Sequence, residues 1–404
     1  HSSVPPNIHF KKVNPAIDLS TQRAVEFPVM STPLITRTGR PPIAGVSSFG
    51  SGGTNSHVLL QQHSSSVIAN SDNSDSCSED GSSSEVVFVF TGQGVPDLLS
   101  TGLGMELFDS EEVFRNTFTL CSQCFSDIRQ LLGCDDSVSL VDILSANLSI
   151  ETQSQIQRNE ALYTQCMLYS LEVSLCRLWE SSGVFPTVVI GHSLGEYAAA
   201  VCAGALDIKT ALQLVAIRAW CVEHTPSSTG ERGAMYAVRA SQTMVEEAIE
   251  SIAWPNSELR PAVAAANGHL SCVIAGVDEN VLRVISLLGC SSKKLLLTHS
   301  FHSPLLSNAA IAFIRTVKNL NAAGAVIIES KTPHCRMIST VTGLDVEKSD
   351  LTVEYWSRHI TNTVQFCDVF MGLLKSFRNE GYAIVEVGPG KTLHKFAMAI
   401  AAAS

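Results

Sequence analysis

The stretch TVVIGHSLGEYAAAVCAG, residues 187–204, constrains the fold of this chain more than any other. A β-branched apolar run passes through the turn GHSLG directly into a helix-forming run rich in alanine. Strands that alternate with helices in this way build parallel α/β sheets. The serine on the corner, Ser193, is either part of a plain tight turn or a nucleophile displayed at the end of the strand.

The residues around Ser193 match the pattern G-x-S-x-G of a nucleophile elbow. Gly191 and Gly195 allow a sharp turn of the backbone, so that the serine hydroxyl projects beyond the strand. The hydroxyl then lies near the positive N-terminus of the next helix, where backbone N–H groups can stabilise an oxyanion. The flanking strand and helix favour a catalytic serine over a plain turn.

The wider hydrophobic pattern predicts a large α/β domain. Strands are expected over EVVFVF, VVI and YAIVEV, and helices over CMLYSLEVSLCRLWES, EYAAAVCA, KTALQLVAIRAWCVEH, the regions near 304–320 and 365–379, and the segment after PGKT. The predicted fold class is therefore α/β, with a large α/β-hydrolase-like subdomain built on a parallel sheet covered by helices.

A different order of predicted strands and helices interrupts this pattern at about residues 234–297. Its order is strand, helix, strand, strand, helix and strand, over GAMYAV, SQTMVEEAIESI, PAVAAANG, SCVIAG, VDENVLRVISLLG and KKLLLTH. This is the order of the ferredoxin-like motif. We therefore expect a small ferredoxin-like subdomain inserted into the large one.

Composition divides the chain into three parts. Residues 63–85 are dominated by Ser, Asp, Asn and Glu, which bury too little apolar surface to fold, and they predict a flexible linker. The linker separates a short piece, residues 1–62, from a main domain, residues 86–404. The N-terminus HSSVPPNIHF has neither a Met nor the layout of a signal peptide, so we expect the chain to be a piece of a longer polypeptide.

Charge and cysteine content exclude several classes of function. A net charge of −11 argues against nucleic acid as a partner, since phosphate binding needs a basic surface. The apolar runs are too short for a membrane span. The 12 scattered cysteines fit reduced thiols in a cytoplasmic protein. Cys121 and Cys124 form one CxxC without a matching second pair, so we expect two small apolar residues on a helix face and no metal site.

A catalytic serine needs a base and a means of selecting its substrate. His299 and His302 in LTHSFHSPLL lie at the predicted junction of the two subdomains, and either could be the base or a structural histidine. Arg218 lies between apolar residues within a predicted helix. Because buried arginine requires an anion, it predicts either a structural salt bridge or a bidentate clamp for a carboxylate substrate.

Several motifs in order narrow these alternatives. They are GQG at 92–94, GHSLGEYAAA at 191–200, AIRAW at 216–220, ANG at 266–268, HSFHSP at 299–304 and EVGPGKTL at 386–393. Together they resemble the malonyl-CoA:acyl-carrier-protein transacylase family. More narrowly, residues 86–402 are similar to the acyltransferase domains of type I polyketide synthases and fatty acid synthases.

The resemblance implies a role for each matching residue. Ser193 corresponds to the nucleophile, His302 to the general base and Arg218 to the residue that binds the free carboxylate of malonate. Gln93 and the backbone N–H of Leu194 correspond to the oxyanion hole.

Further positions follow from the same resemblance. Gln165, in YTQCML, corresponds to an active-site glutamine, although Cys166 replaces the proline that usually follows it. Asn267 corresponds to a site asparagine. The family orients its histidine with a backbone carbonyl rather than an acid, and His359 is the matching position.

The implied reaction is acyl transfer in two steps, without a bound cofactor. Ser193 attacks the thioester of malonyl-CoA to form a seryl ester, and the phosphopantetheine thiol of an acyl carrier protein then takes the acyl group. His299 and Phe301 belong to the HSFH loop, which resembles the HAFH loops that accompany malonyl selectivity. A phenylalanine at 301 would crowd a methyl branch, which favours malonyl over methylmalonyl.

The N-terminal piece carries a second resemblance. PPNIHFKKVNPAIDL and GRPPIAGVSSFGSGGTNSHVLL are similar to the C-terminal tail of a β-ketoacyl synthase, with His57 matching a catalytic histidine. The nucleophilic cysteine segment of a synthase is absent, so condensing activity is not expected of this piece. Synthase tail followed by acyltransferase is the domain order of a type I megasynthase.

Other hypotheses about the function of the main domain remain open at this point. A serine hydrolase also uses G-x-S-x-G, but it needs an acid before its histidine and has no use for Arg218. A non-catalytic docking domain would not need Ser193, His302 and Arg218 together. A methylmalonyl-selective enzyme or one loading an uncharged starter would keep the mechanism, and the latter would be expected to lose Arg218. Lys293 and Lys294 form a basic spot where a carrier protein could dock, or a solvated surface pair.

Overall fold

The computed structural model describes residues 85–94, 98–146, 148–227, 229–231, 233–377 and 382–403, together with four strands nearer the N-terminus. Contacts divide the chain into two compact units, His1–Asp80 and Gly81–Ser404. The linker predicted over 63–85 lies outside the described residues except for Glu85, which already belongs to a strand.

The described residues of the first unit form two pairs of antiparallel strands. β1 (Ser3–Val4) pairs with β2 (Thr32–Pro33), and β3 (Ile43–Phe49) pairs with β4 (Asn55–Gln61). His57 lies on β4 opposite Ser47. The similarity of this piece to a synthase tail stays a prediction.

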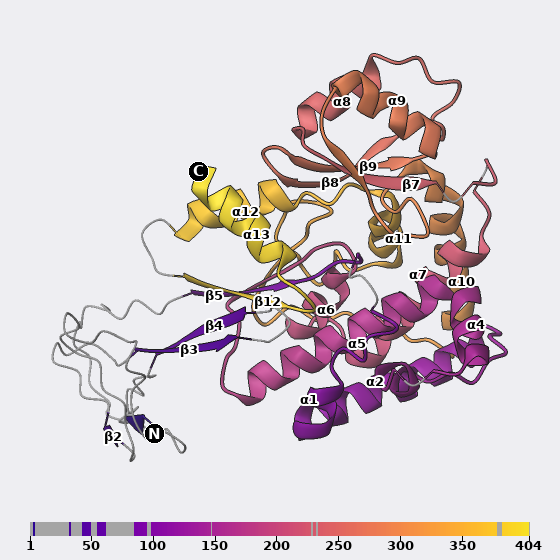
Figure 1. The fold of residues 1–404 in the computed structure, drawn as a ribbon. Helices are drawn as coiled ribbons and strands as arrows, with labels where there is room; N and C mark the ends of the chain where they lie inside the picture. The colour runs from indigo at the N-terminus through magenta and orange to yellow at the C-terminus, as the bar shows by residue number, and fades with distance from the viewer. Residues whose placement is uncertain are drawn as a thin grey trace. The chain divides into compact units, whose positions relative to one another are not determined.

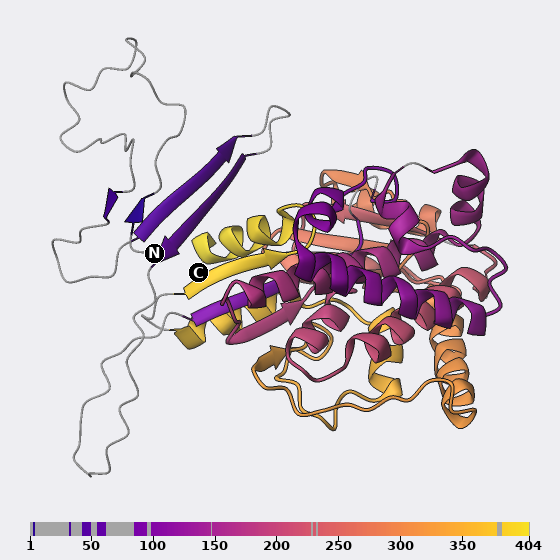
Figure 2. The same ribbon diagram turned by 90° about the horizontal axis from the view of Figure 1, so that it is seen from below.

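The second unit is built on a parallel sheet of four strands in the order β11-β6-β5-β12 (Figure 1). These strands are β5 (Glu85–Phe90), β6 (Val188–Gly191), β11 (Arg336–Ile338) and β12 (Tyr382–Val387). β5 and β6 are the inner strands, and residues 87–90 and 188–191 in them are buried, as expected for strands covered on both faces. Figure 2 shows β5 and β12 side by side.

Helices surround this sheet. They are α1 (Met105–Ser110), α2 (Glu112–Leu131), α3 (Leu140–Leu144), α4 (Ile150–Arg158), α5 (Glu160–Ser181), α6 (Gly195–Cys202), α7 (Ile208–His224), α10 (Ser307–Ala322), α11 (Val353–Thr361), α12 (Phe366–Phe377) and α13 (Thr392–Ala403), with a 3-10 turn at Pro304–Leu306. Helices α2, α5 and α7 pack against one another, and α6 contacts β5 and β6 (Figure 1).

A separate four-stranded antiparallel sheet is inserted between α7 and the 3-10 turn. Its elements are β7 (Ala234–Val238), α8 (Gln242–Glu250), β8 (Ala262–Gly268), β9 (Ser271–Gly276), α9 (Asp278–Leu288) and β10 (Ser292–Lys294). The strand order is β10-β7-β9-β8, and α8 and α9 cover the face turned away from the large sheet (Figure 1). This small subdomain has its own apolar core, which includes Tyr236, Val245 and Ile274.

Several helices and strands differ from the predicted elements in their bounds, and two short elements were not predicted. α5 begins at Glu160, ahead of the predicted start, and it runs without interruption through Cys166, so the missing proline does not alter the helix. β10 ends at Lys294, well before the predicted end of that strand. The strand β11 has only three residues, too few for a recognisable pattern. Helix α11 was also not predicted, although its buried Trp356 and Ile360 recur at helical spacing.

No helix in the described part of the chain combines the length and apolar character needed to cross a membrane. Cys121 and Cys124 lie on α2 as buried residues, in agreement with the interpretation as small apolar side chains.

The turn after β6 predicts a sharp contrast between two glycine substitutions. A Cβ on Gly195 would lie 2.4 Å from the Phe90 carbonyl oxygen, whereas a Cβ on Gly372, within α12, would meet no atom within 4 Å. We expect Gly195→Ala to lower the free energy of unfolding by about 3 kcal/mol, because backbone must move. Gly372→Ala should raise it by about 0.5–1 kcal/mol, as for a helix interior. Urea denaturation measures both; equal effects would contradict the tight packing of this turn.

Candidate active site

Ser193 occupies the corner between β6 and α6. β6 ends at Gly191 and α6 begins at Gly195. The backbone of Ser193 is left-handed, with φ of 51°, which is strained for a residue that has a Cβ. This is the strand–turn–helix context that a nucleophile elbow requires, and the side chain is buried except for 7% of its surface.

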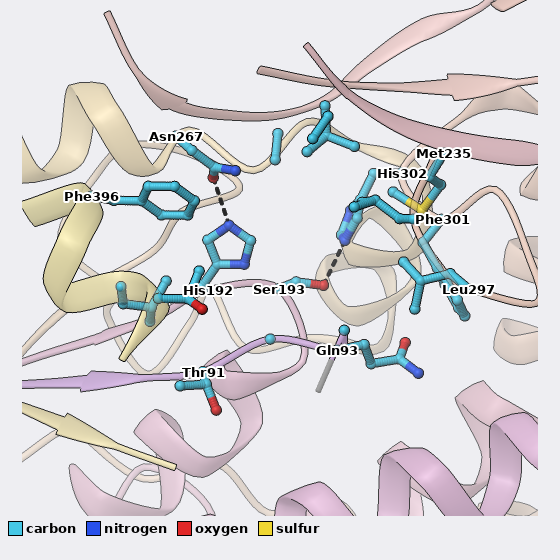
Figure 3. A pocket seen from close by; sticks show the side chains of 18 of the residues that line it. Thr91, Gln93, His192, Ser193, Met235, Asn267, Leu297, Phe301, His302 and Phe396 are labelled. Carbon is cyan, nitrogen blue, oxygen red and sulfur yellow. Dashed lines mark hydrogen bonds between the residues drawn. The ribbon is translucent and has the colours of Figure 1, made fainter. Parts of the chain in front are cut away.

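His302 faces Ser193. Its Nε2 lies 2.6 Å from the Ser193 hydroxyl oxygen (Figure 3), and its backbone is also left-handed, with φ of 59°. The His302 backbone N–H donates to the Ile360 carbonyl at 3.0 Å, and Nδ1 lies 2.8 Å from the Asn362 carbonyl oxygen. An Nδ1–H that donates to this carbonyl leaves Nε2 free to accept the serine proton.

The prediction that the His359 carbonyl orients the base is wrong. The acceptor is Asn362, because His359 still lies inside α11, whereas Asn362 follows the helix with an extended backbone and an unused carbonyl. His359 is instead fully buried beside the pair: its ring centroid lies 6.1 Å from that of His302, and its Nε2 lies 3.9 Å from Glu196 Oε2. Burial lowers the pKa of His359 well below its usual value.

The electrostatic environment keeps His302 neutral. Burial, with the nearby positive charge of Arg218 as a second cause, lowers the pKa of His302 to about 3. A neutral imidazole can accept a proton from the Ser193 hydroxyl, whereas an imidazolium cannot. The pair is therefore ready to react at neutral pH.

Arg218 on α7 and Gln165 on α5 form a buried polar pair next to this dyad. Arg218 is completely buried, and one Nη donates to Gln165 Oε1. The Arg218 Nε and second Nη have no hydrogen-bond partner among the described residues, nor has Gln165 Nε2. Among the described residues no carboxylate pairs with Arg218, so a structural salt bridge of Arg218 is not supported. Unpaired, desolvated N–H groups are suited to receive an anion.

Phe301 packs against Arg218 and also lines the open part of the site. The guanidinium carbon lies 5.3 Å from the centre of the Phe301 ring, and Phe301 lines the cavity while Arg218 does not. His299 is buried, with Nδ1 2.9 Å from the Thr298 hydroxyl and its ring 6.0 Å from that of Phe301. The structure thus places His302 of this loop against Ser193.

A cavity of about 370 Å³ opens in front of the dyad. Its wall includes Gln93, Asn267, Phe301 and both members of the dyad, with apolar side chains from the small subdomain. Figure 3 shows Gln93 beside Ser193, with the amide end of its side chain directed away from the hydroxyl. Leu194 is buried at the N-terminal end of α6, where its N–H adjoins the nucleophile. The cavity therefore gives a substrate access to the Ser193 hydroxyl.

The side chain of Asn267 bonds to the residue that precedes the nucleophile. Its Oδ1 lies 2.8 Å from Nε2 of His192, so it fixes the ring of the residue before the nucleophile. Figure 3 shows His192 and His302 on opposite sides of Ser193. Sequence reasoning missed His192, although its place inside the G-x-S-x-G motif was a usable signal.

Glu196 is a second residue that the sequence analysis missed. Its carboxylate is completely buried behind the turn and accepts hydrogen bonds from the Thr340 N–H at 3.0 Å, the Thr340 hydroxyl at 2.9 Å and the Tyr355 hydroxyl. Burial raises the pKa of Glu196 to about 7. These bonds tie the first turn of α6 to the segments after β11 and on α11.

The basic spot at Lys293 and Lys294 lies on the exposed strand β10. Lys294 pairs with Asp278 at 2.6 Å. Exposure fits both a solvated surface pair and a docking spot for a carrier protein, so both alternatives stay predictions.

Comparison with known proteins identifies the family. The profile described as "Acyl transferase domain" matches residues 87–398. The chain belongs to the acyl transferase domain family. The resemblance inferred from the ordered motifs is thereby confirmed, and the enzyme class is acyltransferase.

Curated relatives of this acyltransferase are much longer proteins. Polyketide synthase GfsA of Streptomyces halstedii is 33% identical over 311 residues, 76% of this chain, and the hybrid synthetase ATPKS of Aspergillus niger is 31% identical over 319 residues, 78% of this chain. The chain spans only 4% and 16% of their respective lengths.

Solved structures show the same fold. An acyltransferase domain from the second module of the salinomycin polyketide synthase matches with a TM-score of 0.64 and 31% identity, over 79% of this chain and 66% of that one. A protein titled MCAT from Streptococcus pneumoniae matches with a TM-score of 0.62 and 26% identity, over 78% and 93%.

The low pKa of His302 predicts a flat pH profile for acylation of Ser193. Since the reactive form is neutral His302, and its pKa is depressed to about 3, the rate should not fall as the pH drops from 8 to 5. The measurement is the rate of serine acylation by p-nitrophenyl acetate against pH. An inflection near pH 6.5, the ordinary histidine value, would contradict the buried environment described here.

Proposed function

We propose that this domain transfers a malonyl unit from malonyl-CoA, through an ester on Ser193, to the phosphopantetheine thiol of an acyl carrier protein. The observation that carries the proposal is the Ser193–His302 hydrogen bond of 2.6 Å next to a buried arginine with unpaired N–H groups. The first feature supports covalent acyl transfer, and the second supports an acyl group with a free carboxylate.

In the first step, His302 Nε2 takes the proton of the Ser193 hydroxyl as the oxygen attacks the thioester carbonyl. The N–H of Leu194 and a donor from Gln93 stabilise the oxyanion. The C–S bond then breaks, and His302 gives its proton to the departing CoA thiolate. In the second step the phosphopantetheine thiol loses its proton to His302 and attacks the ester, and the Ser193 oxygen recovers the proton as it leaves.

Selection of the acyl group rests on Arg218 and Phe301. The free N–H groups of Arg218 would bind the malonyl carboxylate, with Gln165 holding the guanidinium in place. The Phe301 ring, which covers the guanidinium, leaves little room for a methyl branch. A fixed carboxylate also holds the ester where water is poorly placed to attack, which favours transfer over hydrolysis. Methylmalonyl selectivity is the alternative.

The setting of the domain is part of the same proposal. We infer an α/β-hydrolase-like large subdomain with a ferredoxin-like insertion, in a cytoplasmic type I megasynthase whose β-ketoacyl synthase precedes this domain. Hybrid synthetase acdB of Aspergillus candidus, 28% identical, aligns with 97% of this chain, which supports a multidomain parent. Acyl-CoA and an acyl carrier protein are the proposed partners, and no bound cofactor, nucleic acid or membrane takes part in the proposed reaction.

The central test is intact-protein mass spectrometry after brief incubation with malonyl-CoA, methylmalonyl-CoA and acetyl-CoA in competition. We expect a malonyl adduct that is absent from the Ser193→Ala variant. A methylmalonyl adduct would keep the mechanism and overturn the role given to Phe301. Release of CoA without any adduct would indicate a hydrolase.

Replacing Arg218 should change the choice of acyl group. We expect Arg218→Met to lower kcat/KM for malonyl-CoA by about 100-fold or more, since one partner of a buried charged contact is lost. Acylation by acetyl-CoA should change by less than about threefold, because acetyl has no carboxylate. Arg129→Met is the matched control. Arg129 is also a buried arginine, but its guanidinium already pairs with the carboxylate of Asp136. Equal losses for both substrates in Arg218→Met would contradict the carboxylate-binding role.

A further inference from the structure

Glu172 is a buried acid that the proposed mechanism does not use. It lies on α5 and is completely buried. Its Oε1 accepts a hydrogen bond of 2.7 Å from the Thr91 hydroxyl, while Oε2 has no partner among the described residues. A carboxyl group without a salt-bridge partner is costly to bury, so its one strong contact indicates what the residue does.

Thr91 is the residue that connects β5 to the loop carrying Gln93. β5 ends at Phe90, and Thr91 is followed directly by Gly92 and Gln93. The Thr91 N–H also donates to the carbonyl of Val387, the last residue of β12, at 3.3 Å. Thr91 therefore joins two neighbouring strand ends at the edge of the cavity, and Glu172 on α5 fixes its side chain.

Gly388 shows how closely this contact is packed. A Cβ on Gly388 would lie 2.2 Å from the Thr91 hydroxyl oxygen and 3.1 Å from Glu172 Oε1, and the backbone there has φ of +136°. Only glycine leaves room for the Thr91–Glu172 hydrogen bond. The next residues, Pro389 and Gly390, line the cavity, so the same contact supports a second part of its wall.

We propose that Glu172 is a positioning residue, which fixes the Gly92–Gly94 loop and the Gly388–Gly390 turn at the mouth of the active site through its hydrogen bond to Thr91. The inference rests on the proposed function, in which a donor on this loop stabilises the oxyanion. Glu172 acts through Thr91 and does not itself bind the reacting atoms.

The protonation of Glu172 suggests a conservative replacement. Burial raises the pKa of Glu172 well above its ordinary value, which favours the protonated, neutral form of the carboxyl group. A glutamine has the same shape and keeps an oxygen that can accept the Thr91 hydroxyl. Leucine keeps the burial but removes the acceptor, and valine at position 91 removes the donor.

The test is the single-turnover rate of malonyl-serine formation, followed by quenching and intact mass. We expect Glu172→Leu and Thr91→Val each to lower the maximal rate about tenfold, because a small displacement of an oxyanion donor slows the chemical step. The malonyl-CoA concentration at half-maximal rate should not change. The double variant should be no slower than either single variant, since both remove one interaction. Glu172→Gln should remain within about threefold of the unsubstituted chain.

Ser174→Ala provides the matched control. Ser174 is buried on the same helix, but its hydroxyl donates only to the Ser170 carbonyl of α5. It should lower Tm without changing the rate of the folded enzyme. An unchanged rate in Glu172→Leu, a rate loss that Ser174→Ala reproduces at equal Tm, or multiplicative losses in the double variant would overturn the inference.

Failure of the proposed function would have a different signature. If the unsubstituted chain forms no malonyl-serine, the malonyl assignment fails, and the same variants are then compared by acetylation with p-nitrophenyl acetate. A tenfold loss in Glu172→Leu in that assay, restored in Glu172→Gln, would still support the positioning role. Equal rates would overturn it.

Discussion

The hydrogen bond between Ser193 and His302 joins residues 109 positions apart, and much of the fold serves to keep it in place. Both residues have left-handed backbones, a conformation that costs about 1–3 kcal/mol for a residue with a Cβ. Such strain persists only where the surroundings enforce it. For Ser193 the constraint is the short passage from β6 to α6, and for His302 it is two backbone carbonyls at the end of α11.

The buried N–H donors of this site favour the binding of an anion. Arg218 is completely buried with unpaired N–H groups, and the pKa of His302, His359 and Arg218 is lowered in each case mainly by burial. The buried carboxyl group of Glu196 accepts hydrogen bonds from hydroxyl and N–H donors on the far side of the turn. A negative charge entering beside Arg218 would meet donors that have already lost their water, so little further desolvation of the protein is needed.

The sequence predicted those parts of the site that depend on local pattern. Ser193 and the α5 and α7 helices that carry Gln165 and Arg218 follow from turn chemistry and helical periodicity, and His302 follows from its motif. The error at His359 arose because the orienting carbonyl depends on the residue at which α11 ends, and a helix end is poorly marked in sequence. Glu172 and Glu196 were missed because each lies in an apolar helical run, where only tertiary contacts reveal a buried acid.

One short segment connects the base to both subdomains. The Asn362 carbonyl orients His302, while Val364 exchanges backbone hydrogen bonds of 2.9 Å with Ala264 and Ala266 of β8, and the Gln365 N–H donates to the Thr340 carbonyl after β11. The small subdomain is thus anchored two residues from the group that fixes the imidazole. A shift of the small subdomain relative to the large sheet would therefore act on the His302 ring, because one short stretch of backbone carries both contacts. Alignment of the dyad and the width of the cavity are consequently properties of one structural unit.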